Sequence, residues 1–233
     1  MNSPTPNDPV IREATIHVTV ESFTYDAEKL IELAGRTAYK SFNRMSEESA
    51  RPFIRRIVAS GHESVIEHAS ATFRISGISR ACSHQLVRHR IASFTQESQR
   101  YVKQNNMAVV IPESIRADPE RSRVYHTCIA DMAKAYDTLL QMGTIPEDAR
   151  FLLPNASATT VVMTANFREW RHFLEVRGDP HAQWEIRKVA IYIRNALYAI
   201  APAVFEDYRV IENPQTGDKW IVRMAASDGT GST

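Results

Sequence analysis

Two short segments of this chain alternate apolar and polar side chains, and they limit the possible folds more than any other feature. Ile16, Val18 and Val20 alternate with polar residues, and the same period of two returns from Ala69 to Ser76. A period of two predicts β-strands with one buried face. Apolar residues at helical spacing fill much of the remaining chain, so the fold must combine sheet and helix.

The spacing of apolar residues, together with helix-capping residues, predicts the other elements. The predicted helices cover residues 27–42, 46–60, 78–89, 119–142, 147–153, 167–176 and 182–200, and two more strands are predicted at 107–111 and 158–165. The Gly-, Ser- and Asp-rich end of the chain after Pro214 is expected to be frayed. Strands and helices mix without a regular βαβ rhythm, and no linker or internal repeat divides the chain. This pattern indicates one α+β domain.

The charge balance is close to neutral, and cysteines are few. The 233 residues carry 28 Lys and Arg against 27 Asp and Glu, so no global basic field would attract nucleic acid or an anionic membrane. The two cysteines, Cys82 and Cys128, give no disulfide framework. Residues 1–9 lack the apolar core of a signal peptide, and no apolar run approaches the roughly 18 residues of a membrane helix. We therefore expect a cytoplasmic protein.

The segment from Arg88 to Tyr101 is the most distinctive in the chain. It holds three arginines and a histidine among hydroxyl and amide side chains, with few residues suited to a core. Planar guanidinium groups bind phosphate through paired N–H donors. Because residues 91–101 lack a clean period, we expect a loop that carries an anion-binding site. The alternative is a solvated, salt-bridged turn in which arginines favour the dipole of the preceding helix.

Two other polar clusters could contribute to a site. His62 and His68 enclose an acidic segment, but they are six residues apart, whereas a zinc-binding helix places two histidines four apart. We predict no metal site there, but a polar turn that directs His62 and Ser64 toward a cleft. The second cluster lies between apolar elements, which is typical of a ligand pocket. Its members are Arg150, Asn166, Arg168, His172, Arg177, Asp179, His181, Gln183 and Glu185.

Several common catalytic motifs are missing from the sequence. The eight glycines do not form G-x-G-x-x-G or P-loop spacing, and no G-x-S-x-G nucleophile is present. A nucleotide would therefore have to be bound by side chains rather than by a glycine-rich loop.

The basic segment and three further segments resemble those of the flavin-dependent thymidylate synthases. Residues 88–101 read RHRxxSxxxxSxRY, which is similar to the signature of that family. Residues 60–68, 80–87 and 177–186 resemble three other family segments, in the same order, and the likeness runs from about residue 16 to residue 208. Members of this family methylate dUMP with a flavin in place of a catalytic cysteine.

The resemblance implies a fold and an activity. It implies a mostly antiparallel sheet flanked by helices, in a domain at 13–212 between a flexible N-terminal segment (1–12) and a C-terminal tail (213–233). FAD would be the cofactor, NADPH would reduce it, and methylenetetrahydrofolate would supply the carbon that converts dUMP to dTMP. The enzyme would be a homotetramer with active sites shared between subunits.

The resemblance also assigns roles to residues. FAD would be contacted by His62, Ser64, Arg88, His89, Arg90, Asn166, Arg168, His172 and His181. The substrate dUMP would be held by Gln85, Arg88, Gln96, Ser98, Gln99, Arg100, Arg150 and Arg177. Arg100 and Arg150 would face the phosphate, and Arg177 the uracil ring.

Two of these residues would be catalytic. Arg177 would favour the negative charge that develops on the ring. Ser98 would contact the substrate rather than act as a nucleophile, because no neighbouring base is placed to activate it. Many members carry Asn-Glu where this chain has Thr95-Gln96, so Gln96 would contact dUMP without a carboxylate.

Two alternatives stay open on the sequence alone. A nucleic-acid-binding module could use the basic segment with Phe94 and Tyr101 as stacking platforms. A flavoprotein reductase could bind the same cofactor without transferring a methyl group.

Overall fold

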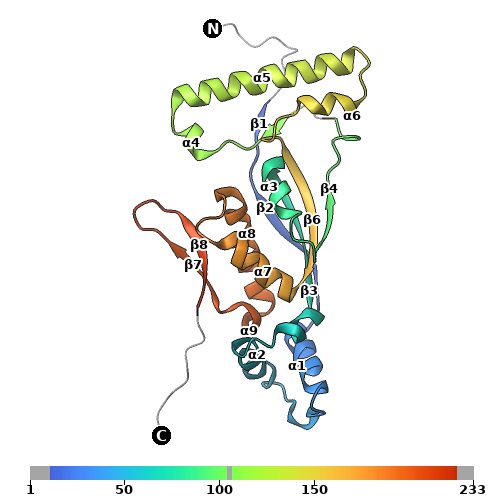
Figure 1. Ribbon diagram of the computed structural model, residues 1–233, viewed down its shortest axis with the longest axis vertical. Coiled ribbons are helices and arrows are strands. Elements are labelled where there is room, and N and C mark those ends of the chain that lie inside the picture. Colours follow the sequence, from blue (N-terminus) through green and yellow to red (C-terminus); the bar gives the residue numbers. More distant parts are fainter. Residues whose placement is uncertain (1–10, 104–106, 225–233) are drawn as a thin grey trace. The chain divides into compact units, whose positions relative to one another are not determined.

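The computed structural model describes residues 11–103 and 107–224 (Figure 1). By its internal contacts the chain divides into two compact units, each assembled from three separate stretches. As far as they are described, unit 1 comprises Met1–His17, Ile75–Leu86 and Thr95–Val161, and unit 2 comprises Val18–Arg74, Val87–Phe94 and Val162–Thr233.

A four-stranded sheet has the strand order β2-β3-β6-β4. Its strands are β2 (His17–Phe23), β3 (Ser70–Ser79), β6 (Ala158–Asn166) and β4 (Ser93–Gln96). Each of these strands contains a boundary between the two units, and the fifth boundary, between Leu86 and Val87, follows the helix Arg80–Leu86. The predicted α+β fold with a mostly antiparallel sheet is confirmed.

The alternation seen in the sequence corresponds to burial in these strands. Ala71, Phe73 and Ile75 of β3 are buried, as their period of two predicts. Strand β6 alternates buried and half-buried residues along its whole length. In unit 2 the sheet is covered by α7 (Phe167–Gly178), whose Trp170 donates to the carbonyl of Ala71 at 3.1 Å.

Unit 1 contains a parallel pair of short strands and a group of helices. The strands are β1 (Arg12–Glu13) and β5 (Ala108–Val109). The helices are α3 (Arg80–Leu86), α4 (Glu113–Arg116), α5 (Pro119–Gln141), α6 (Pro146–Ala149) and the 3-10 helix η3 (Arg150–Leu152). Helix α5 begins at Pro119 because the Asp118 carboxylate accepts hydrogen bonds from the backbone amides of its first turn. Its buried face packs Ile129 and Ala133 against Val109.

Unit 2 is mainly helical and ends in a hairpin. Its remaining elements are α1 (Ala27–Thr37), α2 (Ala50–Ala59), α8 (Trp184–Ile200), α9 (Pro202–Phe205), the 3-10 helices η1 (Phe42–Arg44) and η2 (Glu63–His68), and the antiparallel strands β7 (Tyr208–Glu212) and β8 (Lys219–Arg223). Helices α7 and α8 pack together, and β8 contacts both. Gly178 ends α7 where an added Cβ would lie 2.6 Å from Ile221 Cβ, so this close approach requires glycine.

Several predicted boundaries are wrong, and the reasons are non-local. The chain after Pro214 was expected to fray, yet Lys219–Arg223 form β8 because they pair with β7. Arg12, expected in a flexible segment, pairs within β1 and β5. The predicted loop at 91–101 includes strand β4, and residues 63–68 form η2 rather than a simple turn. The rest of the predicted flexible ends, residues 1–10 and 225–233, lies outside the described residues. Among the described helices, none is both long enough and apolar enough to cross a membrane.

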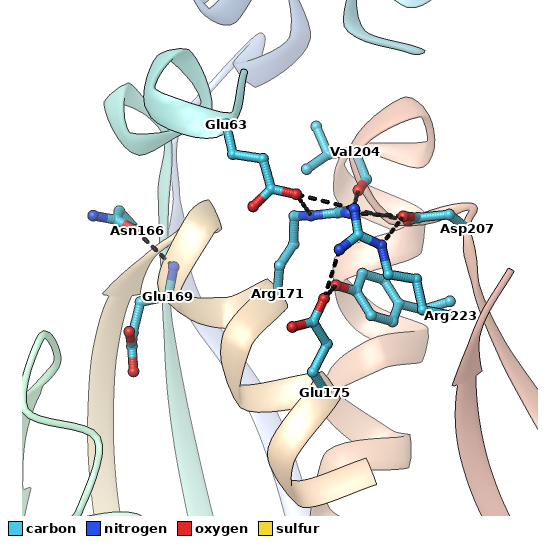
Figure 2. Close-up of polar contacts among 9 residues, drawn as sticks. Glu63, Asn166, Glu169, Arg171, Glu175, Val204, Asp207 and Arg223 are labelled. Atoms are coloured by element: carbon cyan, nitrogen blue, oxygen red, sulfur yellow. Dashed lines mark hydrogen bonds and ion pairs between the residues drawn. The ribbon is translucent and has the colours of Figure 1, made fainter. Parts of the chain in front are cut away.

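A buried arginine on α7 joins several of these elements (Figure 2). The Arg171 side chain is 1% exposed, and it donates to Asp207 at 2.7 and 2.8 Å, to Glu63 at 3.2 Å and to the carbonyl of Val204. Burial alone would lower the pKa of Arg171, but the hydrogen bond and charge of Asp207 reverse that effect and raise it. The guanidinium group is therefore permanently charged and holds α7 to η2, to α9 and to Asp207 in the segment between α9 and β7.

Arg223 of β8 completes this cluster from the hairpin. It donates to Asp207 at 3.2 Å, to Glu63 at 3.1 Å and to Glu175 at 2.9 Å. Tyr208 of β7 donates to the same Glu175 carboxylate at 2.7 Å. The terminal hairpin is thus tied to α7 by charge as well as by apolar packing. We call these residues (Glu63, Arg171, Glu175, Asp207, Tyr208 and Arg223) the Arg171 cluster.

We predict that Arg171→Met lowers the free energy of unfolding by about 1–3 kcal/mol, because it leaves the half-buried carboxylates of Glu63 and Asp207 without their main partner. Urea denaturation measures this change. Lys29→Met is the matched control, since the Lys29–Glu47 pair is exposed and should contribute no more than about 1 kcal/mol. Equal losses in the two variants would contradict the role of Arg171.

Candidate active site

In unit 2, the histidine of the basic segment is buried with both ring nitrogens hydrogen-bonded. His89 Nδ1 lies 3.0 Å from Glu169 Oε1, and Arg177 Nε donates to His89 Nε2 at 3.0 Å. Because an arginine nitrogen can only donate, Nε2 must be the acceptor. Nδ1 therefore carries the proton and donates it to the Glu169 carboxylate. The geometry fixes a neutral imidazole in a single tautomer.

One stripe of helix α7 supplies the partners of His89. Glu169, Phe173 and Arg177 follow one another at intervals of four residues, so they share a helix face. The ring centroids of Phe173 and His89 lie 5.1 Å apart in an edge-to-face contact, and His172 makes a similar contact at 5.6 Å. Asn166 begins the helix and accepts a hydrogen bond from the backbone amide of Glu169 at 2.9 Å.

The pKa of His89 lies below its ordinary value. Burial is the main cause, because it disfavours the charged imidazolium. The hydrogen bond to Glu169 acts in the opposite direction, and the positive charge of Arg177 lowers the pKa further. His89 is therefore neutral near pH 7, in agreement with the tautomer required by its hydrogen bonds.

His89, Glu169 and His172 place ligand atoms within 4.8 Å of one another, a spacing that could hold a metal ion. Both nitrogens of His89 already have partners, and the Arg177 guanidinium at Nε2 would repel a cation. We therefore interpret this cluster as a hydrogen-bonded relay. It includes Glu169, which the sequence analysis did not identify as a site residue.

The residues expected to contact FAD all belong to unit 2. His89 is buried and Asn166 is half-buried as the cap of α7. Arg168 pairs with Glu67 at 2.5 Å, and the backbone amide of His181 donates to Asp179 at 2.8 Å. The exposed members of the set are His62, Ser64, Arg88, Arg90, Arg168, His172 and His181.

Of the residues expected to hold dUMP, two belong to unit 2 and the other six to unit 1. Those in unit 2 are Arg88 and Arg177. Those in unit 1 are Gln85, Gln96, Ser98, Gln99, Arg100 and Arg150.

Unit 1 gathers arginines around the end of the basic segment. Arg100 forms an ion pair with Glu147 at 3.1 Å, and Arg150 Nε donates to the backbone carbonyl of the same residue at 3.0 Å. Arg80 Nη1 reaches the carbonyl of Glu97 at 3.4 Å. Partial burial lowers the pKa of Arg80, and the charge of Arg150 lowers it further, while Glu97 opposes the shift. This concentration of positive charge suits a phosphate.

The amide and hydroxyl groups of the segment have defined partners. Gln96 donates to the hydroxyls of Ser83 at 2.8 Å and Thr159 at 3.3 Å. The Ser98 hydroxyl accepts from the backbone amide of Arg100 at 3.3 Å. A backbone N–H cannot take a proton from the hydroxyl, so this contact orients Ser98 without activating it as a nucleophile.

Three residues of these clusters were not identified from the sequence. Glu169 lies in the first turn of a helix, where an acidic residue is ordinarily explained by the helix dipole. Arg80 and Glu147 belong to other helices, and only the fold brings them to the basic segment. Arg80 does fall within the segment at 80–87 that carries the family resemblance, which was the one available signal.

The fold and these clusters define an α+β protein whose candidate site residues are arginine, histidine and amide side chains rather than a glycine-rich loop. A family model described as "Thymidylate synthase complementing protein" matches residues 19–203. The chain therefore belongs to this family.

Curated relatives carry a more specific name. The flavin-dependent thymidylate synthase of Geobacter sulfurreducens is 43% identical over 192 residues, which cover 79% of this chain and 83% of that protein. The enzyme of the same name from Pyrococcus abyssi is 43% identical over 185 residues, which cover 75% and 76%. Among solved structures, the UMP/dUMP methylase PolB from Streptomyces cacaoi bound with 5-Br UMP matches with a TM-score of 0.74 and 25% identity, covering 85% of this chain and 95% of that one.

We predict that acid destabilises the folded protein partly through His89. Its pKa is lower when folded than in the unfolded chain, about 6.5, so its stabilising contribution is complete above that pH and declines as pH falls below it. His89→Asn, which keeps an amide donor for Glu169, should reduce this dependence. Urea denaturation between about pH 7 and pH 5 measures how the free energy of unfolding changes with pH in the wild-type protein and in His89→Asn. Identical slopes would contradict the lowered pKa of His89.

Proposed function

We propose that this protein is a flavin-dependent thymidylate synthase that reductively methylates dUMP to dTMP without a cysteine nucleophile. The observation that carries the proposal is the arginine cluster of unit 1, in a chain that belongs to this family. Arg80, Arg100 and Arg150 concentrate positive charge where a nucleotide phosphate would be expected. Bidentate guanidinium groups can bind that phosphate where no glycine-rich loop is available.

The donor set of unit 2 fits a flavin dinucleotide. Arg88 and Arg90 are exposed on either side of buried His89, and guanidinium groups suit a pyrophosphate. We propose that FAD is held by these two arginines together with His62, Ser64, His89, Asn166, Arg168, His172 and His181. When bound, the flavin would supply the hydride chemistry that no side chain of this protein provides.

The protein's own contribution is then binding and electrostatics. We assign Arg100 and Arg150 to the phosphate of dUMP, with Gln85, Arg88, Gln96, Ser98 and Gln99 as further contacts. Arg177 would face the uracil ring and stabilise its developing negative charge. The proposal needs no thiolate: Cys82 is buried and Cys128 lies exposed on α5, and neither has a role in it.

Other parts of the proposal concern co-substrates and assembly. NADPH would reduce the flavin and methylenetetrahydrofolate would donate the carbon. The enzyme would be a homotetramer with active sites shared between subunits, and the cytoplasmic location expected from the sequence stays a prediction.

The nucleic-acid alternative is weakened by the surroundings of the basic segment. Tyr101 is 77% exposed, but Phe94 is half-buried, so the two rings do not form an open stacking platform. The reductase alternative is separated by product analysis: purified protein that binds FAD and oxidises NADPH but makes no dTMP from dUMP and methylenetetrahydrofolate would favour it.

We predict that Arg177→Ala lowers dTMP formation by about 100-fold or more, because the ring loses a preorganised positive charge. The hydrogen bond to His89 should account for about 1 kcal/mol of any loss of stability. Product formation is followed by chromatography with saturating FAD, and unfolding is measured in parallel. Arg209→Ala, which removes an exposed arginine of the same unit, is the control. Unchanged turnover in Arg177→Ala would contradict its assignment.

A further inference from the structure

We propose that Glu169 is a positioning residue for Arg177 and that it acts through His89. The inference rests on the proposed function, since it takes Arg177 as the residue that faces the uracil ring. It assigns Glu169 a role that the residue types and their spacing do not suggest. The carboxylate would not touch the substrate; it would set the orientation of the group that does.

The hydrogen bonds around His89 have a defined direction. Glu169 accepts from His89 Nδ1, and His89 Nε2 accepts from Arg177 Nε, each at 3.0 Å. Only an acceptor at Nδ1 leaves the neutral ring with its lone pair at Nε2, facing the arginine. Glu169 and Arg177 thus favour the same tautomer of His89, and only that tautomer gives Arg177 Nε an acceptor at Nε2.

The relay of Glu169, His89 and Arg177 is held rigidly on one face of α7. Glu169 and Arg177 lie on the same face of α7, and His89 bridges them across eight residues of the helix. Phe173, between them on that face, contacts the imidazole edge-to-face. In Figure 2 the Glu169 side chain points away from the Arg171 cluster, which secures α7 independently. The His89 ring is therefore oriented at Nδ1 by Glu169 and at Nε2 by Arg177. Both residues belong to a helix that the Arg171 cluster holds in place.

The charges of Glu169 and Arg177 balance around His89. The groups that act on His89 are Glu169, Arg177 and His172, all of them on α7. A carboxylate, a neutral imidazole and a guanidinium group carry no net charge together, which suits a buried position. A protonated His89 would point an N–H at the N–H of Arg177, and this arrangement is repulsive.

Removal of Glu169 should break the relay in a specific way. In Glu169→Ala the Nδ1–H has lost its acceptor, and the other tautomer, with Nε2–H toward Arg177, becomes competitive. Arg177 Nε would then lose its acceptor at His89 Nε2, and the orientation of the guanidinium group would change. Because Arg177 is assigned to the transition state, kcat and kcat/KM should fall together, while the affinity for dUMP changes little. In Glu169→Gln the side-chain oxygen can still accept from Nδ1–H, so the tautomer and the turnover should be retained.

The test combines nitrogen NMR of labelled histidine with steady-state kinetics on the full chain. His89→Asn identifies the His89 signal. Wild-type protein should show His89 with the proton on Nδ1, without any ligand added, and Glu169→Ala should show loss of that tautomer. For turnover of dUMP with saturating FAD we expect a decrease of roughly 10- to 100-fold in Glu169→Ala, the size expected when a catalytic group is misplaced. Turnover in Glu169→Gln should stay near the wild-type rate.

A second carboxylate of α7 serves as the matched control. Glu175 belongs to the Arg171 cluster on another face of the helix, so Glu175→Gln should leave both the His89 tautomer and the turnover unchanged. If Glu169→Ala does not fold, Glu169→Asp replaces it, because the shorter side chain draws the carboxylate back from Nδ1.

The outcomes separate the possible explanations. An unchanged tautomer in both Glu169→Ala and Glu169→Asp overturns the proposal, and so does a changed tautomer with unchanged turnover. Low turnover that Glu169→Gln does not rescue indicates a general structural role and also overturns it. If wild-type protein makes no dTMP, the proposed function fails. The tautomer measurement then still decides whether Glu169 orients His89, because it needs no substrate.

Discussion

The burial of Arg171 is the constraint on which the organisation of unit 2 depends. Removing a guanidinium group from water costs several kcal/mol, and this cost is offset only where carboxylates and carbonyls surround it. Here the partners come from η2, from α9 and from the segment between α9 and β7. Arg223 then brings β8 to the same carboxylates. Such a cluster adds little net stability over an apolar core, but it specifies which segments must meet around α7.

Two buried side chains that differ in charge interact with helix α7, and only the first of them belongs to it. Arg171 is permanently charged, because its carboxylate partners raise its pKa even though burial opposes this. His89, held against another face, is neutral because burial lowers its pKa more than Glu169 raises it. The charged cluster fixes the helix among its neighbours, and the neutral relay uses that fixed helix to orient Arg177. Sites built on a rigid element hold their side chains more closely than sites on loops.

The parts of this fold that the sequence predicted are those set by local periodicity. Ala71, Phe73 and Ile75 were expected on the buried face of one strand, and they are buried. Long helices such as α5 were also predicted nearly to the residue. The β7–β8 hairpin was missed, because Lys219–Arg223 are held by pairing and ion pairs with distant residues. Glu169 was missed for a similar reason. In the sequence it is an acidic residue in the first turn of a helix, and only the fold shows that His89 lies beside it.

The basic segment shows why a motif and a structural unit need not coincide. Its fourteen residues contain the boundary between Phe94 and Thr95, inside strand β4. Arg88, His89 and Arg90 thus belong to unit 2 with every residue assigned to the flavin, whereas Gln96 to Arg100 belong to unit 1 with the arginine cluster.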